Sequence, residues 1–222
     1  RLDLAKKNVS VIKDITRNIM KHYNSGVIMA VSNPVDVVTH IIQQESQLPK
    51  GIVFGTGTVL DSARFRWLLA KKLGINVKNV HGFVAGEHGD SQFAVWSSVH
   101  IGGMALDKYC KVHNIEINKE EIENEVKHSG AEVIKRKGAT YYAIASVVAS
   151  LADAIVKDKK AIYHTSKLLD GQYGIKDICL SLPTIMGING AEKTIEFNFT
   201  DEELQKLYNS EKVIRSFLDN LE

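Results

Sequence analysis

The segment Val27-Ile28-Met29-Ala30-Val31-Ser32-Asn33-Pro34-Val35-Asp36 indicates the class of fold. Its first five residues form an unbroken apolar run, which is typical of a parallel strand buried on both faces. Ser32 and Pro34 then supply an N-cap and a first helical position, so a helix is expected over residues 37–44. An amphipathic helix is predicted before the strand, over residues 3–22. Helix, buried strand and helix in succession predict a doubly wound α/β layer.

The rest of the chain repeats this pattern once and then changes. Ile52-Val53-Phe54-Gly55 indicates a second buried strand, followed by a helix over residues 60–73 that Gly74 ends. The later predictions are strands over 77–85 and 92–101 around a loop at 86–91, a helical stretch over 119–159 broken near Gly138, a strand-like segment over 175–199 with a turn at Asn189-Gly190, and a last helix capped by Thr200 and Glu203. We therefore expect an α/β portion over residues 1–55, the C-terminal part of a parallel-sheet domain, and a mixed α+β domain over residues 56–222.

Composition excludes several classes of partner. The 222 residues include 28 Lys and Arg and 26 Asp and Glu, a net charge of +2, so nothing favours nucleic acid or an anionic membrane. No apolar run reaches the ~18 residues of a membrane span. Cys110 and Cys179 lie too far apart for a disulfide framework, and the histidines show no paired metal-ligand spacing. A reducing, cytoplasmic location without a bound metal is expected.

Three groups of residues are candidates for chemistry. Asn33 follows the first buried strand, at the edge of a parallel sheet where ligands gather, although the residue taken alone favours a cap of the next helix. Asp61 and Arg64 are three residues apart and share a helix face, whereas Arg66 points nearly the opposite way. An inward arginine can clamp a carboxylate with two parallel bonds, but the same spacing also suits an exposed intrahelical pair.

Histidines supply the third group. His88 lies in the loop Gly86-Glu87-His88-Gly89-Asp90-Ser91, where an acidic partner would raise its pKa and let it exchange protons near neutral pH. A structural loop histidine is the competing interpretation. His81 alternates with apolar neighbours in a predicted strand and, by itself, indicates only packing.

Taken together, four motifs are more specific than any of these residues alone. The chain contains Val31-Ser32-Asn33-Pro34-Val35-Asp36, Leu60-Asp61-Ser62-Ala63-Arg64, Gly86-Glu87-His88-Gly89-Asp90-Ser91 and Lys137-Gly138-Ala139-Thr140-Tyr141-Tyr142-Ala143-Ile144, in this order. In this order they resemble the bacterial branch of the NAD-dependent L-lactate dehydrogenase family. The resemblance covers the whole chain and implies the end of a Rossmann sheet followed by the catalytic domain.

The resemblance implies a role for each matching position. His88 corresponds to the proton donor and acceptor, and Asp61 to the carboxylate that orients it. Arg64, Asn33, Asp36 and Thr140 correspond to substrate-binding residues, and Val31, Ser32, Asn33 and Ile144 to cofactor-binding ones. The implied cofactor is NAD, the implied substrates are pyruvate and L-lactate, and the implied assembly is a homo-oligomer, a tetramer.

The bacterial branch also implies an effector. Its members bind fructose 1,6-bisphosphate through an arginine two residues past the substrate clamp and a histidine seven residues before the catalytic one. Arg66 and His81 occupy these positions here. The opposite directions of Arg64 and Arg66 on one helix agree with two separate sites.

Two alternatives stay open from the sequence. The family's glycine-rich phosphate loop and its second catalytic arginine precede the matched segment, and we expect this chain, which opens at Arg1 within helical periodicity, to be the inside of a longer protein. Malate dehydrogenase is the alternative within the family, although Glu87 and Thr140 favour lactate, because malate relatives usually carry Gly before the histidine and lack the threonine. A non-catalytic binding or assembly module is the alternative outside it.

Overall fold

The computed structural model describes residues 2–221, with side chains from residue 9 onward; Arg1 and Glu222 lie outside the described range. Its centre is a five-stranded sheet in the order β1-β2-β8-β9-β10. The strands are β1 (Ile28–Ala30), β2 (Val53–Gly55), β8 (Ala161–Asp170), β9 (Lys176–Gly187) and β10 (Gly190–Thr194). β1 and β2 run parallel, with Ile28 opposite Val53, which confirms the predicted parallel pair. The other neighbours are antiparallel, and Gly55 of β2 pairs with Ser166 of β8.

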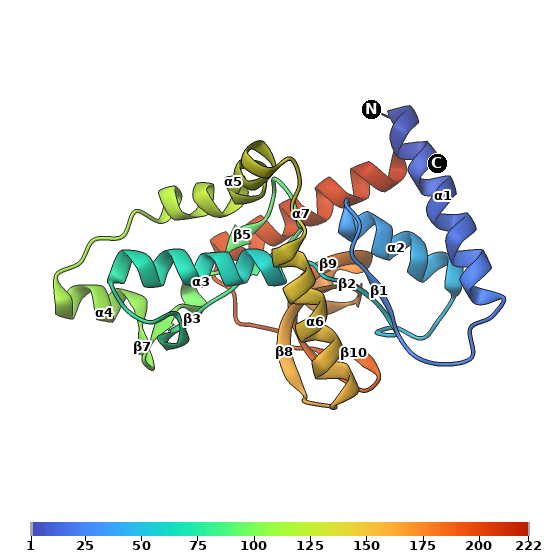
Figure 1. Ribbon diagram of the computed structural model, residues 1–222. Helices are drawn as coiled ribbons and strands as arrows, with labels where there is room; N and C mark the ends of the chain where they lie inside the picture. Colours follow the sequence, from blue (N-terminus) through green and yellow to red (C-terminus); the bar gives the residue numbers. More distant parts are fainter. Residues whose placement is uncertain (1, 222) are drawn as a thin grey trace.

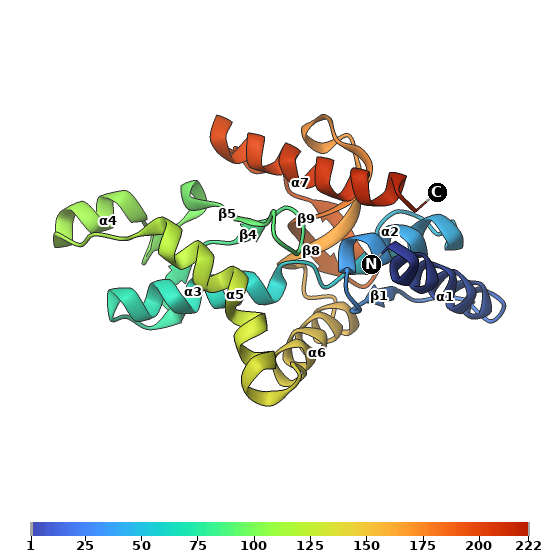
Figure 2. The same cartoon turned by 90° about the horizontal axis from the view of Figure 1, so that it is seen from above.

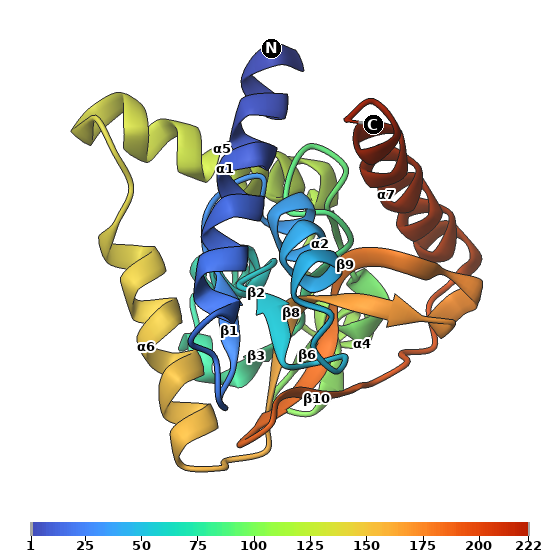
Figure 3. The same ribbon diagram turned by 90° about the vertical axis from the view of Figure 1, so that its right-hand side faces the viewer.

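Helices surround this sheet and form a second lobe beside it (Figure 1). They are α1 (Leu2–Met20), α2 (Val35–Ser46), α3 (Val59–Leu73), α4 (Leu106–His113), α5 (Lys119–Lys137), α6 (Tyr142–Val156) and α7 (Asp201–Asp219). α6 and α7 lie on opposite sides of β8 and β9 (Figure 2). α1 and α2 lie side by side (Figure 3). Ile12 of α1 packs against Ala30, Val35 and Val38.

Two apolar clusters follow from this layering. On one face of the sheet, α6 buries Leu151 and Ala154 against Phe54 and Met186. On the other, Val37 and Ile41 of α2 and Leu207 of α7 pack against the β9 residues Ile178, Leu180 and Leu182. A third cluster fills the lobe of α3, α4 and α5, with Phe65 at its centre. The lobes meet where α3 leaves the sheet.

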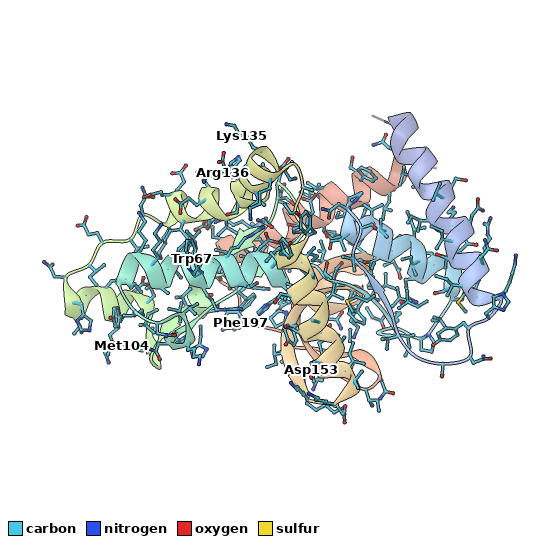
Figure 4. All side chains as sticks on the ribbon, viewed as in Figure 1. Trp67, Met104, Lys135, Arg136, Asp153 and Phe197 are labelled. Atoms are coloured by element: carbon cyan, nitrogen blue, oxygen red, sulfur yellow. The ribbon has the colours of Figure 1, made fainter. Side chains whose placement is uncertain are left out.

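Several predicted elements are confirmed. α3 ends at Gly74, which adopts the left-handed conformation (φ 66°). The long helical stretch breaks at Gly138 (φ 78°) between α5 and α6. Figure 4 shows Lys135 and Arg136 at this end of α5 and Asp153 far along α6. α7 begins with the complete Thr200–Glu203 capping box.

The start of α2 corrects one prediction. Pro34 is the N-cap rather than the first helical residue, with an extended backbone (φ −74°, ψ 114°), and no side chain caps the helix. Helical geometry begins only at Val35. Asn33 therefore does not cap α2, and its side chain is available to the adjoining cavity.

Strand β8 has no counterpart among the predictions. Its middle residues Thr165, Ser166 and Lys167 are polar yet buried, because helices cover both faces of the central sheet. A strand buried on both faces shows no alternation of polar and apolar residues. In β8 the three polar residues also interrupt the continuous apolar run by which a strand buried on both faces is otherwise predicted.

The strand predictions at 77–85, 92–101 and 175–199 need adjustment. The first two break into β3 (Val80–His81), β4 (Val84–Ala85), β5 (Phe93–Ala94) and β6 (His100–Ile101), which with β7 (Met104–Ala105) form two small antiparallel sheets. Short 3₁₀ turns at Val77–Asn79 and Trp96–Ser98 interrupt them. The β9–β10 turn lies at Ile188-Asn189, one residue earlier than predicted. Between β10 and residue 221 no further strand forms, although Phe197 packs edge-on against Phe83.

Candidate active site

A cavity of about 580 Å³ lies at the carboxyl ends of β1 and β2, between α3, α5 and α6. Its wall is formed by residues that follow β1 and β2, by α3, α5 and α6, and by the loop that carries His88. The lining residues are Val31, Asn33, Thr56, Gly57, Leu60, Asp61, Arg64, His88, Gly89, Asp90, Gln92, Lys127, Gly130, Ala131, Ile134, Thr140 and Ile144. This is the edge of an open parallel sheet at which ligands bind.

Asp61 stands between a histidine and an arginine. Its Oδ2 lies 2.7 Å from Nδ1 of His88, and its Oδ1 lies 3.4 Å from Nη1 of Arg64. The Asp61 side chain is only 3% exposed, whereas those of His88 and Arg64 are 27% and 19% exposed. Because a carboxylate oxygen can only accept, the hydrogen on the His88 ring is assigned to Nδ1, and Nε2 faces away from Asp61.

The protonation of His88 reflects two opposing effects. Burial lowers the pKa of His88, but the hydrogen bond and negative charge of Asp61 outweigh burial, so the net pKa is raised above its ordinary value. His88 can therefore hold a proton near neutral pH and release it to an acceptor on the Nε2 side.

Asp36 lies behind the cavity rather than in its wall. The residue is 1% exposed, and its Oδ2 accepts the backbone N–H of His88 at 2.7 Å. Its Oδ1 has no hydrogen-bond partner among the described residues. Burial raises the pKa of Asp36 to about 6, although the nearby Ser166 hydroxyl and the His88 N–H both lower it. The carboxyl group thus holds the main chain of the histidine.

The loop that carries His88 is anchored at both ends. Gly86 exchanges two backbone hydrogen bonds with Ser181 of β9, at 3.0 and 2.9 Å. Glu87 accepts both the N–H and the hydroxyl of Ser91, and the hydroxyl of Ser210 on α7 donates to the Ser91 carbonyl at 2.9 Å. The catalytic candidate is therefore held by the sheet and by α7.

The remaining predicted residues lie elsewhere. Ser32 is exposed and outside the cavity wall. Arg66 and His81 lie away from the cavity, where Nη1 of Arg66 donates to the Gly82 carbonyl at 3.1 Å. Over the described part of the chain, no group of three or more possible ligands could hold a metal ion, and no helix is long and apolar enough to cross a membrane.

Comparison with known proteins places this site in a family. Residues 1–55 match the NAD-binding domain of the lactate/malate dehydrogenases, and residues 58–222 match their α/β C-terminal domain. This chain belongs to the lactate/malate dehydrogenase family. It is thus an NAD-dependent 2-hydroxy acid dehydrogenase by descent.

Individual relatives agree over the full chain. An L-lactate dehydrogenase of Acetivibrio thermocellus is 43% identical, over 100% of this chain and 71% of the relative. L-lactate dehydrogenase 1 of Clostridium acetobutylicum is 42% identical, over 100% and 72%. The solved L-lactate dehydrogenase from Clostridium thermocellum has a TM-score of 0.91 at 47% identity, over 99% of this chain and 73% of that one. The ligand-bound minor L-lactate dehydrogenase from Enterococcus mundtii has a TM-score of 0.95 at 37% identity, over 100% and 71%.

The cavity of this dehydrogenase fits the nicotinamide end of NAD. Val31, Leu60 and Ile144 give an apolar surface for a flat ring, and Asn33 and Thr56 place polar groups at the ends of two parallel strands. Thr56 was not among the predicted site residues. Its position directly after the second buried strand, in Gly55-Thr56-Gly57-Thr58, is the signal that could have found it. The α5 residues of the wall carry no such signal, because a distant helix brings them there.

Proposed function

We propose that the full-length protein interconverts pyruvate and L-lactate with NADH and NAD⁺. The main observation behind this proposal is that His88, Asp61 and Arg64 meet in one cavity at the carboxyl ends of β1 and β2. The named relatives, which match the whole chain, support the same substrate pair. His88, Asp61, Arg64, Asn33 and Thr140, which all line the cavity, keep the roles that the four motifs imply.

Each side chain has a defined task in pyruvate reduction. Arg64 binds the substrate carboxylate, and Asn33 and Thr140, which line the same cavity, contact the rest of the substrate. Nε2 of His88 gives its proton to the carbonyl oxygen, while Asp61 stabilises the imidazolium before transfer. Bound NADH supplies a hydride to the carbonyl carbon. Lactate oxidation needs the same histidine neutral, so that Nε2 can accept the hydroxyl proton.

Asp36 takes a different part from the predicted substrate contact. Its bond to the His88 N–H and its burial make it a positioning residue that holds the main chain of His88 in place. Ser32 is exposed beside Asn33, and its proposed contact is with a part of the cofactor that lies outside this cavity.

Fructose 1,6-bisphosphate is the proposed activator. α3 directs Arg64 into the cavity and Arg66 toward Gly82, which adjoins His81, so the two arginines serve separate sites. Phosphate binding at Arg66 and His81 would link activity to subunit assembly. We propose that the assembled protein is a tetramer and that it is located in the cytoplasm.

One assay separates these proposals. The full-length protein is tested with NADH and either pyruvate or oxaloacetate, with and without fructose 1,6-bisphosphate. We expect a higher kcat/KM for pyruvate and a lower pyruvate KM with the effector. His88→Ala is the matched control, which should lose ~10²–10⁴ in turnover yet bind NADH normally.

Other outcomes would identify an alternative. Preference for oxaloacetate would indicate a malate dehydrogenase, and turnover of neither substrate would indicate a non-catalytic module. An unchanged pyruvate KM at saturating effector would remove the proposed activation alone.

A further inference from the structure

His100 stands directly opposite His81 in the antiparallel pair of β3 and β6. The neighbouring pair in the same register, Val80 and Ile101, is buried at 2% and 4% exposure. Because side chains alternate between the faces of a strand, both histidines project from the other face, where both are exposed. Directly opposite residues have their Cβ atoms ~5 Å apart, so the two imidazoles are within reach of one small ligand.

The orientation of the His100 ring leaves one nitrogen free for such a ligand. Nδ1 lies 2.9 Å from the carbonyl oxygen of Ser98, which can only accept, so the hydrogen is assigned to Nδ1. Within the described residues, Nε2 makes no hydrogen bond. A proton on Nε2 would give the ring a charge and a second donor directed away from its own strand.

Arg66 brings a half-buried guanidinium to the end of β3. It donates to the carbonyl of Gly82, the residue after His81, so α3 places a cation beside the main chain of the strand that carries His81. On its other side, His100 faces the uncharged Ala105 of β7. Arg66, His81 and His100 form no ion pair with a carboxylate among residues 9–221.

We propose that His100 binds a phosphate group together with His81 and Arg66. This inference rests on the proposed effector site and adds a third residue to it, from a different strand. The Nε2–H of His100 donates to one phosphate oxygen, the His81 ring to another, and the guanidinium supplies the fixed charge.

The test compares His100→Asn with the wild type in the full-length protein, using isothermal titration calorimetry. Asn keeps a side-chain nitrogen near the position of Nδ1, able to donate to Ser98, and lacks the outward nitrogen. We expect the Kd for fructose 1,6-bisphosphate to rise about tenfold, the size of one charge-assisted hydrogen bond, with kcat/KM for pyruvate unchanged in the absence of effector. His100→Gln, which carries a neutral donor near the position of Nε2, should recover part of the loss.

His128→Asn is the matched control. His128 is exposed on α5, and its Nδ1 lies 2.8 Å from the backbone carbonyl of Asn124, so the substitution removes the same kind of ring from a remote surface. Its Kd should stay within about twofold of the wild type.

Inorganic phosphate as a second ligand separates the outcomes. Loss of phosphate binding in His100→Asn supports the inference even where the sugar bisphosphate itself does not bind. Wild-type affinity for both ligands in His100→Asn, with weaker binding in His81→Asn, overturns the inference and leaves the proposed effector site intact. A wild type that binds neither ligand overturns both.

Discussion

Asp36 is the residue at which burial and charge conflict most directly. It is 1% exposed, one of its oxygens has no partner among the described residues, and the other holds the His88 N–H. The resemblance implied that this position contacts the substrate. A motif shows that a residue belongs to the region of the site, but it does not show how deeply the residue is buried. Depth below the cavity surface depends on the helices and strands packed over it.

Asp36→Asn tests the electrostatic cost of that burial. Burial raises the pKa of Asp36 to about 6, against ~4 in the unfolded chain. Between these values the folded state binds more protons, so this group lowers the free energy of unfolding as pH rises from ~4 to ~6. A shift of about 2 units corresponds to about 3 kcal/mol. The difference in free energy of unfolding between Asp36→Asn and the wild type should therefore shift by about 3 kcal/mol in favour of the variant as the pH rises from 4 to 7.

Urea unfolding of both proteins at pH 4.5, 5.5 and 7 measures this difference. Asp107→Asn, which removes a highly exposed carboxylate, is the control and should keep the wild-type pH dependence. A wild-type pH dependence in Asp36→Asn would show that Asp36 does not titrate in this range.

At the scale of elements, the beginning of α7 illustrates a local signal that also has a tertiary use. Glu203 accepts the N–H of Thr200 at 3.0 Å, closing the capping box, and it also accepts the N–H and hydroxyl of Ser97 at 3.0 and 2.6 Å. The capping box is predictable because all its partners lie within four residues. The bonds to Ser97 are not, since they cross 106 residues of sequence.

Thr200→Ala should lower the free energy of unfolding by about 1 kcal/mol, because it removes the side-chain oxygen that accepts the Glu203 N–H. Thr200→Ser keeps this oxygen and should lie within about 0.5 kcal/mol of wild type. Chemical denaturation of the three proteins gives the comparison, with kcat for pyruvate expected to be equal in all three. Equal stability of the Ala and Ser variants would show that the cap contributes nothing.

At the scale of the whole molecule, Gly57 lies in the connection from β2 to α3, where the main chain passes close to β8. A Cβ at this position would lie 2.5 Å from the Ser166 nitrogen and 2.9 Å from the His164 carbonyl oxygen, both backbone atoms of β8. Gly57 also has a φ of 50°, which disfavours other residues. The close approach lets β2 turn into α3 directly above β8, where the cavity begins.

Gly57→Ala should therefore destabilise the protein by more than about 3 kcal/mol or abolish folding, because the main chain of β8 has to move. Gly74→Ala is the matched control: φ is 66° there, but no atom lies within 4 Å of the added Cβ. Its cost should be only about 1 kcal/mol, that of the left-handed backbone alone. Thermal melting measures both, and equal losses would argue against a steric role for Gly57.

By itself, the sequence determined the features whose signals are local. The apolar runs of β1 and β2, the glycine ends of α3 and α5, and the α7 capping box depend on neighbours a few residues away, so the pattern was sufficient to place them. The burial of β1 on both faces was predicted wrongly, because β1 is an edge strand in which only Ala30 is buried and Val31 is 39% exposed. The motifs around Asn33, Asp61, Arg64 and His88 likewise predicted the family, which the comparisons confirm.

Only the tertiary structure decided the rest. It revealed β8, whose polar central residues are buried between two layers, and the α5 side of the cavity wall. It placed Asp36 beneath His88 and set His100 opposite His81. Burial and cross-strand register are properties of surfaces that meet from distant parts of the chain, and no local spacing in the sequence specifies them.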